Sequence, residues 1–329
     1  MVKNIAISVV AFFFCASCAL DTRYYEERGN IFGTTYRIKY KSSQLLTKKI
    51  DSELQKFDFS MNPFNPNSII SKVNRNEDVE VDDWFITVFN KAMEVSEKSD
   101  GFFDVTCAPL INLWGFGFEN ADNISQQTID SLKSFIGYKK IRLENRRIIK
   151  DDPRIKLNFS AIAKGFASDV IAELLEKEGV ENYMVWIGGE VTVNGKNPDG
   201  KCWQIGTNTP GGGIDEYENM ANLCGKRGCA TSGNYRNFYI KDGKRYAHTI
   251  NPKTGYPAEE DILSATIVAS DCMTADAYAT AFMAMGIEAA CKMAENIPEI
   301  EYYLLYSDNN SPNKYKRIYS NGIKSIMKL

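Results

Sequence analysis

The stretch that decides the fold runs Asn182-Tyr183-Met184-Val185-Trp186-Ile187-Gly188-Gly189-Glu190-Val191-Thr192-Val193. Residues 182–187 are typical of a buried strand, the two glycines bend the chain, and residues 190–193 resume as a strand. Around this segment, the sequence predicts strands at 33–40, 202–207, 235–240, 263–269 and 301–306 and helices at 44–57, 82–98 and 160–177. Because helices and strands mix without strict alternation, we expect an α+β fold rather than a doubly wound parallel sheet.

The single histidine, His248, lies in a turn-rich run that extends from Ala247 to Gly255. A short apolar stretch there leads into Asn-Pro-x-x-Gly, which predicts a strand end running into a tight turn. Imidazole is the side chain whose ordinary pKa lies near neutrality, so proton transfer by imidazole can occur at this one place. Two interpretations remain open: a functional residue on a loop, or a surface histidine at a strand end.

The N-terminus has the pattern of a bacterial export signal. A basic start precedes a short apolar run over residues 5–15, which is too short to span a bilayer. Small residues just before Cys18 resemble a lipobox, whose cysteine is lipidated and becomes the mature N-terminus; the alternative is ordinary cleavage nearby, with Cys18 a bystander. We expect a signal peptide at 1–17, a tether at 18–29 and one domain at 30–329, anchored to the inner membrane and facing the periplasm.

Composition and charge exclude some partners. Hydrophobic content of 44% and charged content of 25% are those of an ordinary globular protein. With a net charge of −3 and no polybasic block, the chain is not expected to bind nucleic acid. An anionic substrate would need neutralising by local cations or a metal, because the net charge of the protein does not attract it.

The eight cysteines give only weak signals. Four are scattered singly, without the spacing of metal ligands: Cys107, Cys202, Cys272 and Cys291. Cys224 and Cys229 bracket Gly-Lys-Arg-Gly and could close a small loop in an oxidising periplasm. With one histidine in the chain, a zinc site has little to build from.

Two segments suggest a pocket that holds an aromatic, phosphorylated ligand. Residues 100–117 mix aromatic residues with glycines, which can wall a pocket for a flat ring, although ordinary core aromatics give the same pattern. Residues 157–166 open a helix with Ser160 as a candidate N-cap. The free N–H groups of its first turn, together with Lys164, would suit a phosphate, but any amphipathic helix start looks similar.

Two other segments carry polar side chains that could take part in binding or catalysis. Asp276 and Thr280 stand four residues apart, so on a helix both oxygens project from one face and make a hard-oxygen pair fit for Mg²⁺. The alternative is that the helix dipole favours Asp276 and that Thr280 bonds back to a carbonyl. Residues 230–237 form a polar turn before a strand, which places Arg236 near the turn.

These segments, in this order, resemble the ApbE family, the FAD:protein FMN transferases. The resemblance extends from about residue 30 to 320, and its matching pieces are 32–36, 61–68, 100–117, 160–166, 187–190, 230–237, 248–255 and 275–280. It implies a T-fold-related single large domain of two lobes, with mainly antiparallel sheets and flanking helices. It also implies an exported, often lipid-anchored, Mg²⁺-dependent enzyme.

The activity that the resemblance implies is cleavage of FAD and attachment of FMN, through a phosphoester, to a threonine or serine of a target protein, with release of AMP. The targets of the family include membrane or periplasmic electron-transport proteins. His248 would take the proton from the acceptor hydroxyl or orient it. The Mg²⁺ ligands would be Asp276, Thr280 and the Ala161 carbonyl. The residues at FAD-contacting positions would be Phe32, Phe64, Phe102, Phe103, Asp104, Asn158, Lys164, Thr249 and Ile250.

The chain departs from the family pattern at four positions near the expected flavin site. Phe32 stands where Met is common, Phe64 where Tyr is common, and Asn158 and Asn234 where Asp is common. Two rival functions remain on the same fold: an FAD pyrophosphatase that releases FMN to water, and a non-catalytic FAD-binding lipoprotein. Retention of His248, Asp276 and Thr280 argues against the carrier.

Overall fold

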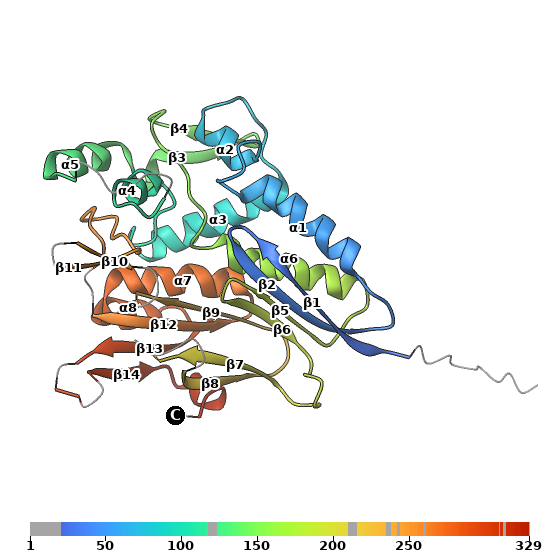
Figure 1. Cartoon of the computed structure of the whole chain (residues 1–329). Helices are drawn as coiled ribbons and strands as arrows, with labels where there is room; N and C mark the ends of the chain where they lie inside the picture. Colours follow the sequence, from blue (N-terminus) through green and yellow to red (C-terminus); the bar gives the residue numbers. More distant parts are fainter. Residues whose placement is uncertain are drawn as a thin grey trace, which may run out of the picture.

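The computed structural model describes residues 21–117, 124–209, 216–234, 238–241, 244–258, 261–308, 310–311 and 314–328 (Figure 1). The helices are α1 (Thr47–Met61), α2 (Ile69–Asn74), α3 (Asp83–Lys98), α4 (Ala108–Leu113), α5 (Gln126–Phe135), α6 (Ala163–Lys177), α7 (Cys272–Met285) and α8 (Ile287–Ala294), with 3₁₀ turns η1 (Tyr138–Lys140) and η2 (Gly322–Ser325). The strands are β1 (Arg23–Ile31), β2 (Thr34–Ser42), β3 (Ile141–Glu144), β4 (Arg147–Lys150), β5 (Tyr183–Ile187), β6 (Glu190–Asn194), β7 (Trp203–Asn208), β8 (Tyr217–Leu223), β9 (Arg227–Gly233), β10 (Phe238–Lys241), β11 (Lys244–Ala247), β12 (Ile262–Ala269), β13 (Glu301–Ser307) and β14 (Tyr315–Tyr319).

An eight-stranded antiparallel sheet forms the centre of the molecule, in the order β1-β2-β5-β6-β9-β12-β13-β14. The segment quoted first forms the β5–β6 hairpin in the middle of this order, with Ile187 opposite Glu190. Gly188 and Gly189 make its turn at φ 64° and 120°, a region that favours glycine. The α+β prediction is confirmed, because the helices pack on an antiparallel sheet and not between parallel strands.

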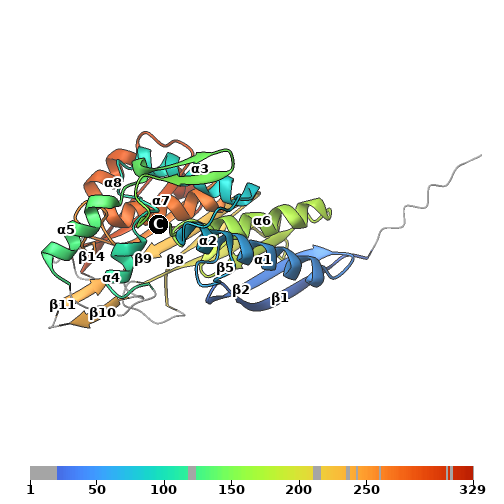
Figure 2. The same ribbon diagram turned by 90° about the horizontal axis from the view of Figure 1, so that it is seen from above.

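Helices α6 and α7 cover one face of the sheet, and α1 and α3 lie outside them (Figures 1 and 2). The apolar residues of α6 and α7 join the sheet in one large core cluster, which includes Ile171, Leu175 and Phe282. The two helices approach closely at Gly165, where a Cβ would stand 2.3 Å from the carbonyl oxygen of Cys272. The N-terminal turn of α6 and the middle of α7 therefore lie side by side.

The opposite face of the sheet is covered by the β7–β8 hairpin and the C-terminal segment (Figure 1). A second, smaller apolar cluster lies there, built around residues such as Val191, Trp203 and Leu305. A disulfide joins Cys202 to Cys224, with their Cα atoms 4.8 Å apart. The possible pairing of Cys224 with Cys229 does not form: Trp203 pairs with Leu223, which sets Cys202 opposite Cys224, whereas Cys229 is buried in β9 with its thiol free.

The start of the chain and of α6 differ from the predictions. The expected tether at 18–29 overlaps β1, which pairs along its whole length with β2 and ends at a hairpin turn whose residues Phe32 and Gly33 both have positive φ. Ser160 is not the N-cap of α6, because the helix begins at Ala163 and Ile162 occupies the N-cap position. The Ser160 N–H donates to Asn158 Oδ1 at 2.8 Å in the loop before the helix.

Some predictions fall outside the described residues. The signal at 1–17, Cys18 and Arg236 all belong to segments that the structure does not describe. Within the described ranges, no helix combines the length and the apolar character needed to cross a bilayer.

Candidate functional site

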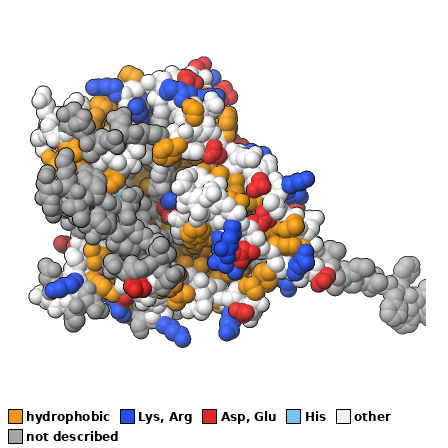
Figure 3. Space-filling view, viewed as in Figure 1, with side chains coloured by type: hydrophobic (Ala, Val, Ile, Leu, Met, Phe, Trp, Pro, Cys, Tyr) orange, Lys and Arg blue, Asp and Glu red, His pale blue; other side chains and the backbone are white. Residues whose placement is uncertain are grey.

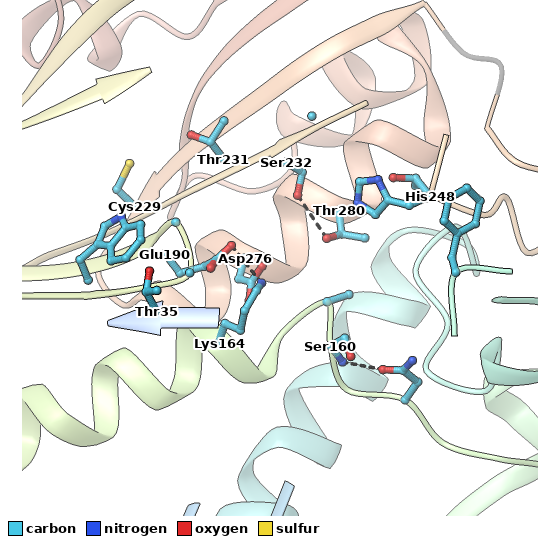
Figure 4. A pocket seen from close by; sticks show the side chains of 18 of the residues that line it. Thr35, Ser160, Lys164, Glu190, Cys229, Thr231, Ser232, His248, Asp276 and Thr280 are labelled. Carbon is cyan, nitrogen blue, oxygen red and sulfur yellow. Dashed lines mark hydrogen bonds and ion pairs between the residues drawn. The ribbon is translucent and has the colours of Figure 1, made fainter. Parts of the chain in front are cut away.

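A cavity of about 1170 Å³ opens beside the N-terminal turn of α6. Its lining comes from the helix face, from the loops around α4 and His248, and from the edge of β9 (Figure 4). Positive and negative side chains are intermixed on the described part of the face seen in Figure 3. The charged residues that line the cavity itself are the candidates for recognising a charged ligand.

Three charged side chains meet at the floor of this cavity. The Lys164 ammonium lies 3.0 Å from Glu190 Oε1 and 4.0 Å from Asp276 Oδ2. Glu190 and Asp276 are buried, with only 5% and 2% of their surfaces exposed. Asp276 Oδ2 also accepts a hydrogen bond from the N–H of Gly165 at 3.0 Å. The α6 start, the β6 start and the middle of α7 thus hold two carboxylates around one ammonium group.

Burial and mutual charge shift the pKa of each member of this cluster. Burial raises the pKa of Glu190 and of Asp276, and the Lys164 ammonium opposes both shifts. Burial alone would lower the pKa of Lys164, but the carboxylates of Asp276 and Glu190 hold it above its ordinary value. The cluster carries one more acidic group than basic group, and Glu190 Oε2 is buried without a hydrogen-bond partner. A further cation would relieve both features.

Oxygen donors suited to such a cation surround Asp276. The Thr280 hydroxyl, one turn further along α7, lies 3.3 Å from the Ser232 hydroxyl, and Ala161 lines the same cavity (Figure 4). Carboxylate, hydroxyl and carbonyl oxygens are the donor types that Mg²⁺ prefers. Among the described residues, no group of three or more His, Cys, Asp or Glu side chains is arranged to hold a metal ion. The donor set fits a hard divalent cation.

His248 follows β11 directly and points into the cavity toward Thr280 (Figure 4). The predicted tight turn is present after it: Asn251 Oδ1 accepts the N–H of Lys253 at 2.9 Å, and Gly255 has φ 81°. Trp114 Nε1 donates to the Gly255 carbonyl at 2.8 Å, which ties this turn to the end of α4. The imidazole therefore sits on a loop that the scaffold holds in place.

Aromatic side chains form a wall of the cavity, as predicted for 100–117. Phe64 is 60% exposed at the rim, and Phe102 and Phe103 line the wall below it, with Phe103 buried. Asp104 lines the cavity too, but its carboxylate is engaged in local structure, since it accepts the Thr106 hydroxyl at 2.6 Å and the N–H of Tyr138 at 2.9 Å. Burial raises its pKa. We infer that Asp104 shapes this loop.

Of the remaining residues assigned by resemblance, three line the cavity and one does not. Asn158, Thr249 and Ile250 line the cavity with Lys164. Phe32 does not line it; its ring packs 5.2 Å from that of Phe57, in an aromatic cluster beneath α1.

Glu190 is the residue of this site that sequence reasoning did not assign. The signal was present, because a glutamate stands at the start of a strand predicted to be buried, directly after two glycines. A buried carboxylate needs a partner, and such a position indicates a functional or paired charge. The partner, Lys164, comes from a different element, so only the fold reveals the pair.

Comparison with known proteins defines the class. The ApbE family model matches residues 32–304. The FAD:protein FMN transferase of Vibrio cholerae serotype O1 is 34% identical over 305 residues, which cover 89% of this chain and 91% of the relative. That of Haemophilus influenzae is 34% identical over 316 residues, covering 89% and 90%. The solved flavin transferase ApbE of Vibrio cholerae superposes with a TM-score of 0.82 at 32% identity, covering 93% of this chain and 100% of that one.

The antiparallel sheet, the two packed helices and the cavity at their start are those of a flavin-transferase fold. The chain belongs to the ApbE family.

Proposed function

We propose that the protein is an FAD:protein FMN transferase, which moves FMN from FAD to a serine or threonine hydroxyl of another protein and releases AMP. The observation that carries the proposal is the cluster of Lys164, Asp276 and Glu190 at the start of α6, with His248 facing the same cavity. This arrangement provides cationic and backbone donors for a pyrophosphate, beside a proton acceptor for the attacking hydroxyl. The homologous transferases share the fold at full length.

The reaction needs one bond to form and one to break. The acceptor oxygen attacks the phosphorus on the riboflavin side of the pyrophosphate, and the bond from this phosphorus to the bridging oxygen breaks. The electron pair of that bond leaves with AMP, and the hydroxyl proton goes to an imidazole nitrogen of His248. A positioned base of this kind contributes about 10²–10⁴-fold to the rate.

Lys164 binds and orients the pyrophosphate in this scheme. Its ammonium is held by Glu190 and Asp276, so it does not swing freely, and the N-terminal end of α6 adds its partial positive charge. Charge that develops on the departing phosphate is stabilised by groups already in position. Glu190 thereby acts as a positioning residue, because it fixes the Lys164 ammonium at the cavity floor.

The metal of the proposed enzyme is Mg²⁺, held by Asp276, Thr280 and the Ala161 carbonyl. The excess acidic charge and the hard-oxygen donors of this region support the assignment. When bound, Mg²⁺ would neutralise charge on the pyrophosphate. Direct titration tests the site: added Mg²⁺ is expected to raise the thermal stability of the wild-type protein and not that of Asp276→Ala.

We further propose that Cys18 is lipidated and holds the domain at the inner membrane, facing the periplasm. The basic start, the short apolar run and the small residues before Cys18 support this. The acceptor would then be a membrane or periplasmic electron-transport protein within reach of the anchor. Cys18→Ala is expected to leave the protein in the soluble fraction; fractionation with membranes as before would refute lipidation.

The deciding experiment incubates the purified protein with FAD, Mg²⁺ and a candidate acceptor domain, followed by intact-mass analysis. A gain of one FMN on the acceptor, with AMP released in equal amount, is the expected result. Release of FMN and AMP without an acceptor adduct would indicate a pyrophosphatase instead. Stoichiometric binding of FAD with no cleavage would indicate a carrier.

A further inference from the structure

Strand β9 is paired on both sides only at Gly228 and Cys229. Its first residues, 227–229, pair with β6, where Cys229 stands opposite Val191. Its whole length from Gly228 to Gly233 pairs with β12 on the other side. Beyond Cys229, no strand in the described part of the chain pairs with β9 on the side where β6 lies. The second half of β9 therefore presents an open strand edge inside the sheet.

The β5–β6 turn is the reason for this opening. Continuing the register of β6 backwards would set Gly189 opposite Thr231, but Gly188 and Gly189 turn the chain away into β5. A gap is left beside the open edge, and the cavity runs through it: Thr231, Ser232 and Gly233 all line the cavity. The edge of β9 is therefore accessible at the point where the sheet is interrupted.

Alternation along the ladder shows which backbone groups face the gap. The N–H of Asn234 donates to the Leu263 carbonyl at 3.2 Å, so Ser232 and Ala230, which lie two and four residues earlier, also exchange backbone hydrogen bonds with β12. The N–H and C=O groups of Thr231 and Gly233 therefore point away from β12 and into the gap. Among the described residues, no strand pairs with β9 on that side beyond Cys229. Two residues with unpaired donors and acceptors are a template for an added strand.

The two faces of this edge differ in chemistry. The Ser232 side chain faces α7, with its hydroxyl 3.3 Å from that of Thr280 (Figure 4). On the other face, the cavity is lined by Trp186, Ile205 and Tyr217, the last of which is 52% exposed. A chain laid along the edge would present alternate side chains to the catalytic cluster and to this apolar wall.

We propose that the open edge of β9 docks the acceptor protein as a short antiparallel strand, with the acceptor serine or threonine opposite Ser232. Residues directly opposite each other in an antiparallel pair point to the same face, so this hydroxyl faces Thr280 and the side where His248 lies. The residues on either side of it exchange backbone bonds with Thr231 and Gly233. The inference rests on the proposed function and names where its second substrate binds.

Backbone pairing also explains how a protein substrate is recognised with few side-chain contacts. Main-chain bonds supply affinity for any extended segment, and the apolar wall selects its flanking residues. The group transfer is unchanged: the docked hydroxyl forms the new phosphoester, the pyrophosphate bond breaks, and the proton goes to His248.

The first test removes one backbone donor of the edge. Thr231→Pro removes the N–H that faces the gap. It removes no hydrogen bond to β12, because the Thr231 N–H points away from β12, and proline is tolerated where a strand N–H is unpaired. Thr231→Val is the matched control, since it removes only the hydroxyl, which lies 2.9 Å from that of Thr266. We expect Thr231→Pro to raise KM for the acceptor domain at least tenfold, with FAD affinity, measured by flavin fluorescence, within twofold of wild type. Thr231→Val keeps the N–H, so its acceptor KM should stay well below that of Thr231→Pro.

The second test changes the substrate, so it does not depend on the folding of a variant. Synthetic peptides spanning the acceptor residue are N-methylated at one position each. Methylation of the residue before or after the acceptor should block labelling, whereas methylation of the acceptor residue itself should leave labelling within twofold, since that N–H points away from β9.

The outcomes separate the two proposals. An unchanged acceptor KM in Thr231→Pro, or equal sensitivity to methylation at all three positions, would overturn the docking edge. Loss of FAD affinity in Thr231→Pro would reassign the edge to FAD and also overturn it. Failure of the wild-type protein to label any acceptor, by contrast, would count against the transferase function itself.

Discussion

The two faces of the central sheet are stabilised by different means. On the helix face, buried polar groups are numerous: Lys164, Glu190 and Asp276 meet beneath the cavity, in a position that costs desolvation energy. On the hairpin face, an apolar cluster and the Cys202–Cys224 bond hold β7–β8 in place. The comparison indicates that the charged groups of the site are concentrated on the helix face, where burial is costly, whereas the hairpin face supplies stability and, through Ile205 and Tyr217, part of the cavity wall.

A second carboxylate shows how the helix face keeps its geometry despite this cost. Asp169 of α6 accepts the N–H groups of Cys272 and Met273 at the start of α7, at 3.0 and 2.8 Å, and the Thr192 hydroxyl at 2.7 Å. Burial raises its pKa to about 7. It links α6, α7 and β6, the three elements that carry Lys164, Asp276 and Glu190. The three elements are therefore connected by buried hydrogen bonds, and substitutions within them are expected to alter the geometry of the site.

The largest effect is expected from Asp276→Asn. The amide keeps an acceptor for the Gly165 N–H but removes the charge that pairs with Lys164 and would hold Mg²⁺. Loss of several kcal/mol of charge stabilisation corresponds to a decrease of about 10³-fold in transfer rate. Thr280→Ala, which removes a neutral ligand that water can replace, should lose far less.

The check on Asp276→Asn is a rate measurement across a Mg²⁺ titration, with thermal unfolding of the same sample. EDTA should abolish wild-type turnover and added Mg²⁺ should restore it, whereas saturating Mg²⁺ should not rescue Asp276→Asn. Full wild-type activity in EDTA would falsify the metal assignment and leave this part of α7 a packing element.

The next effect is expected from His248→Ala. Removing the imidazole should lower the transfer rate by about 10²–10⁴-fold and leave FAD affinity unchanged, because the side chain is proposed as the base. A small loss of thermal stability is expected, since the ring also packs edge-on against Phe116, with the centroids 6.4 Å apart. Tyr256→Phe, on the same turn, is the matched control: its hydroxyl bonds the exposed Gln126 at 2.8 Å, so transfer should persist. Equal loss in both variants would mean that the turn, and not the imidazole, is what matters.

A smaller effect, shared between activity and stability, is expected from Gly165→Ala. In a helix interior this change ordinarily stabilises by about 0.5–1 kcal/mol. Here the new Cβ would meet the Cys272 carbonyl oxygen at 2.3 Å and Asp276 Cβ at 2.8 Å, so α6 and α7 must separate. We expect a net loss of about 1–3 kcal/mol in urea unfolding, with reduced transfer. A variant as stable and active as wild type would show that the two helices are not tightly coupled.

The sequence predicted most of the local elements, because local patterns determine them. Helix α3 begins after Asp82, whose side chain accepts the Phe85 N–H at 2.8 Å, and the chain turns at Asp100 and Gly101, as the predicted helix at 82–98 requires. The glycines and apolar residues of the β5–β6 segment likewise predict its hairpin. The positions of Asp276 and Thr280 on one helix were also predicted correctly.

What failed depended on pairing between distant segments. The disulfide follows the β7–β8 register, which spacing along the chain does not reveal, so the sequence suggested only the nearer pair, Cys224 and Cys229, as a possibility. Strand β1 was missed because its polar residues are matched by β2: Glu26 pairs with Arg37 at 2.8 Å. The Ser160 cap failed because α6 begins two residues later than a cap at Ser160 requires, at Ala163. The open edge of β9 arises only from the topology of four strands.

The smallest effect on transfer is expected from removing the disulfide, and it tests the hairpin face directly. Cys202→Ser with Cys224→Ser frees a loop of 22 residues, for which chain entropy predicts a loss of about 3 kcal/mol in stability. The bond joins Cys202 to Cys224, neither of which lines the cavity with Lys164 and Asp276, so the transfer rate at saturating acceptor, below the unfolding temperature, should stay within twofold of wild type. Cys291→Ser, which removes a free and partly buried thiol, is the control and should change neither quantity. If the double variant lost transfer while still folded, the hairpin face would be coupled to the catalytic cluster. The division between a face for chemistry and a face for stability would then be wrong.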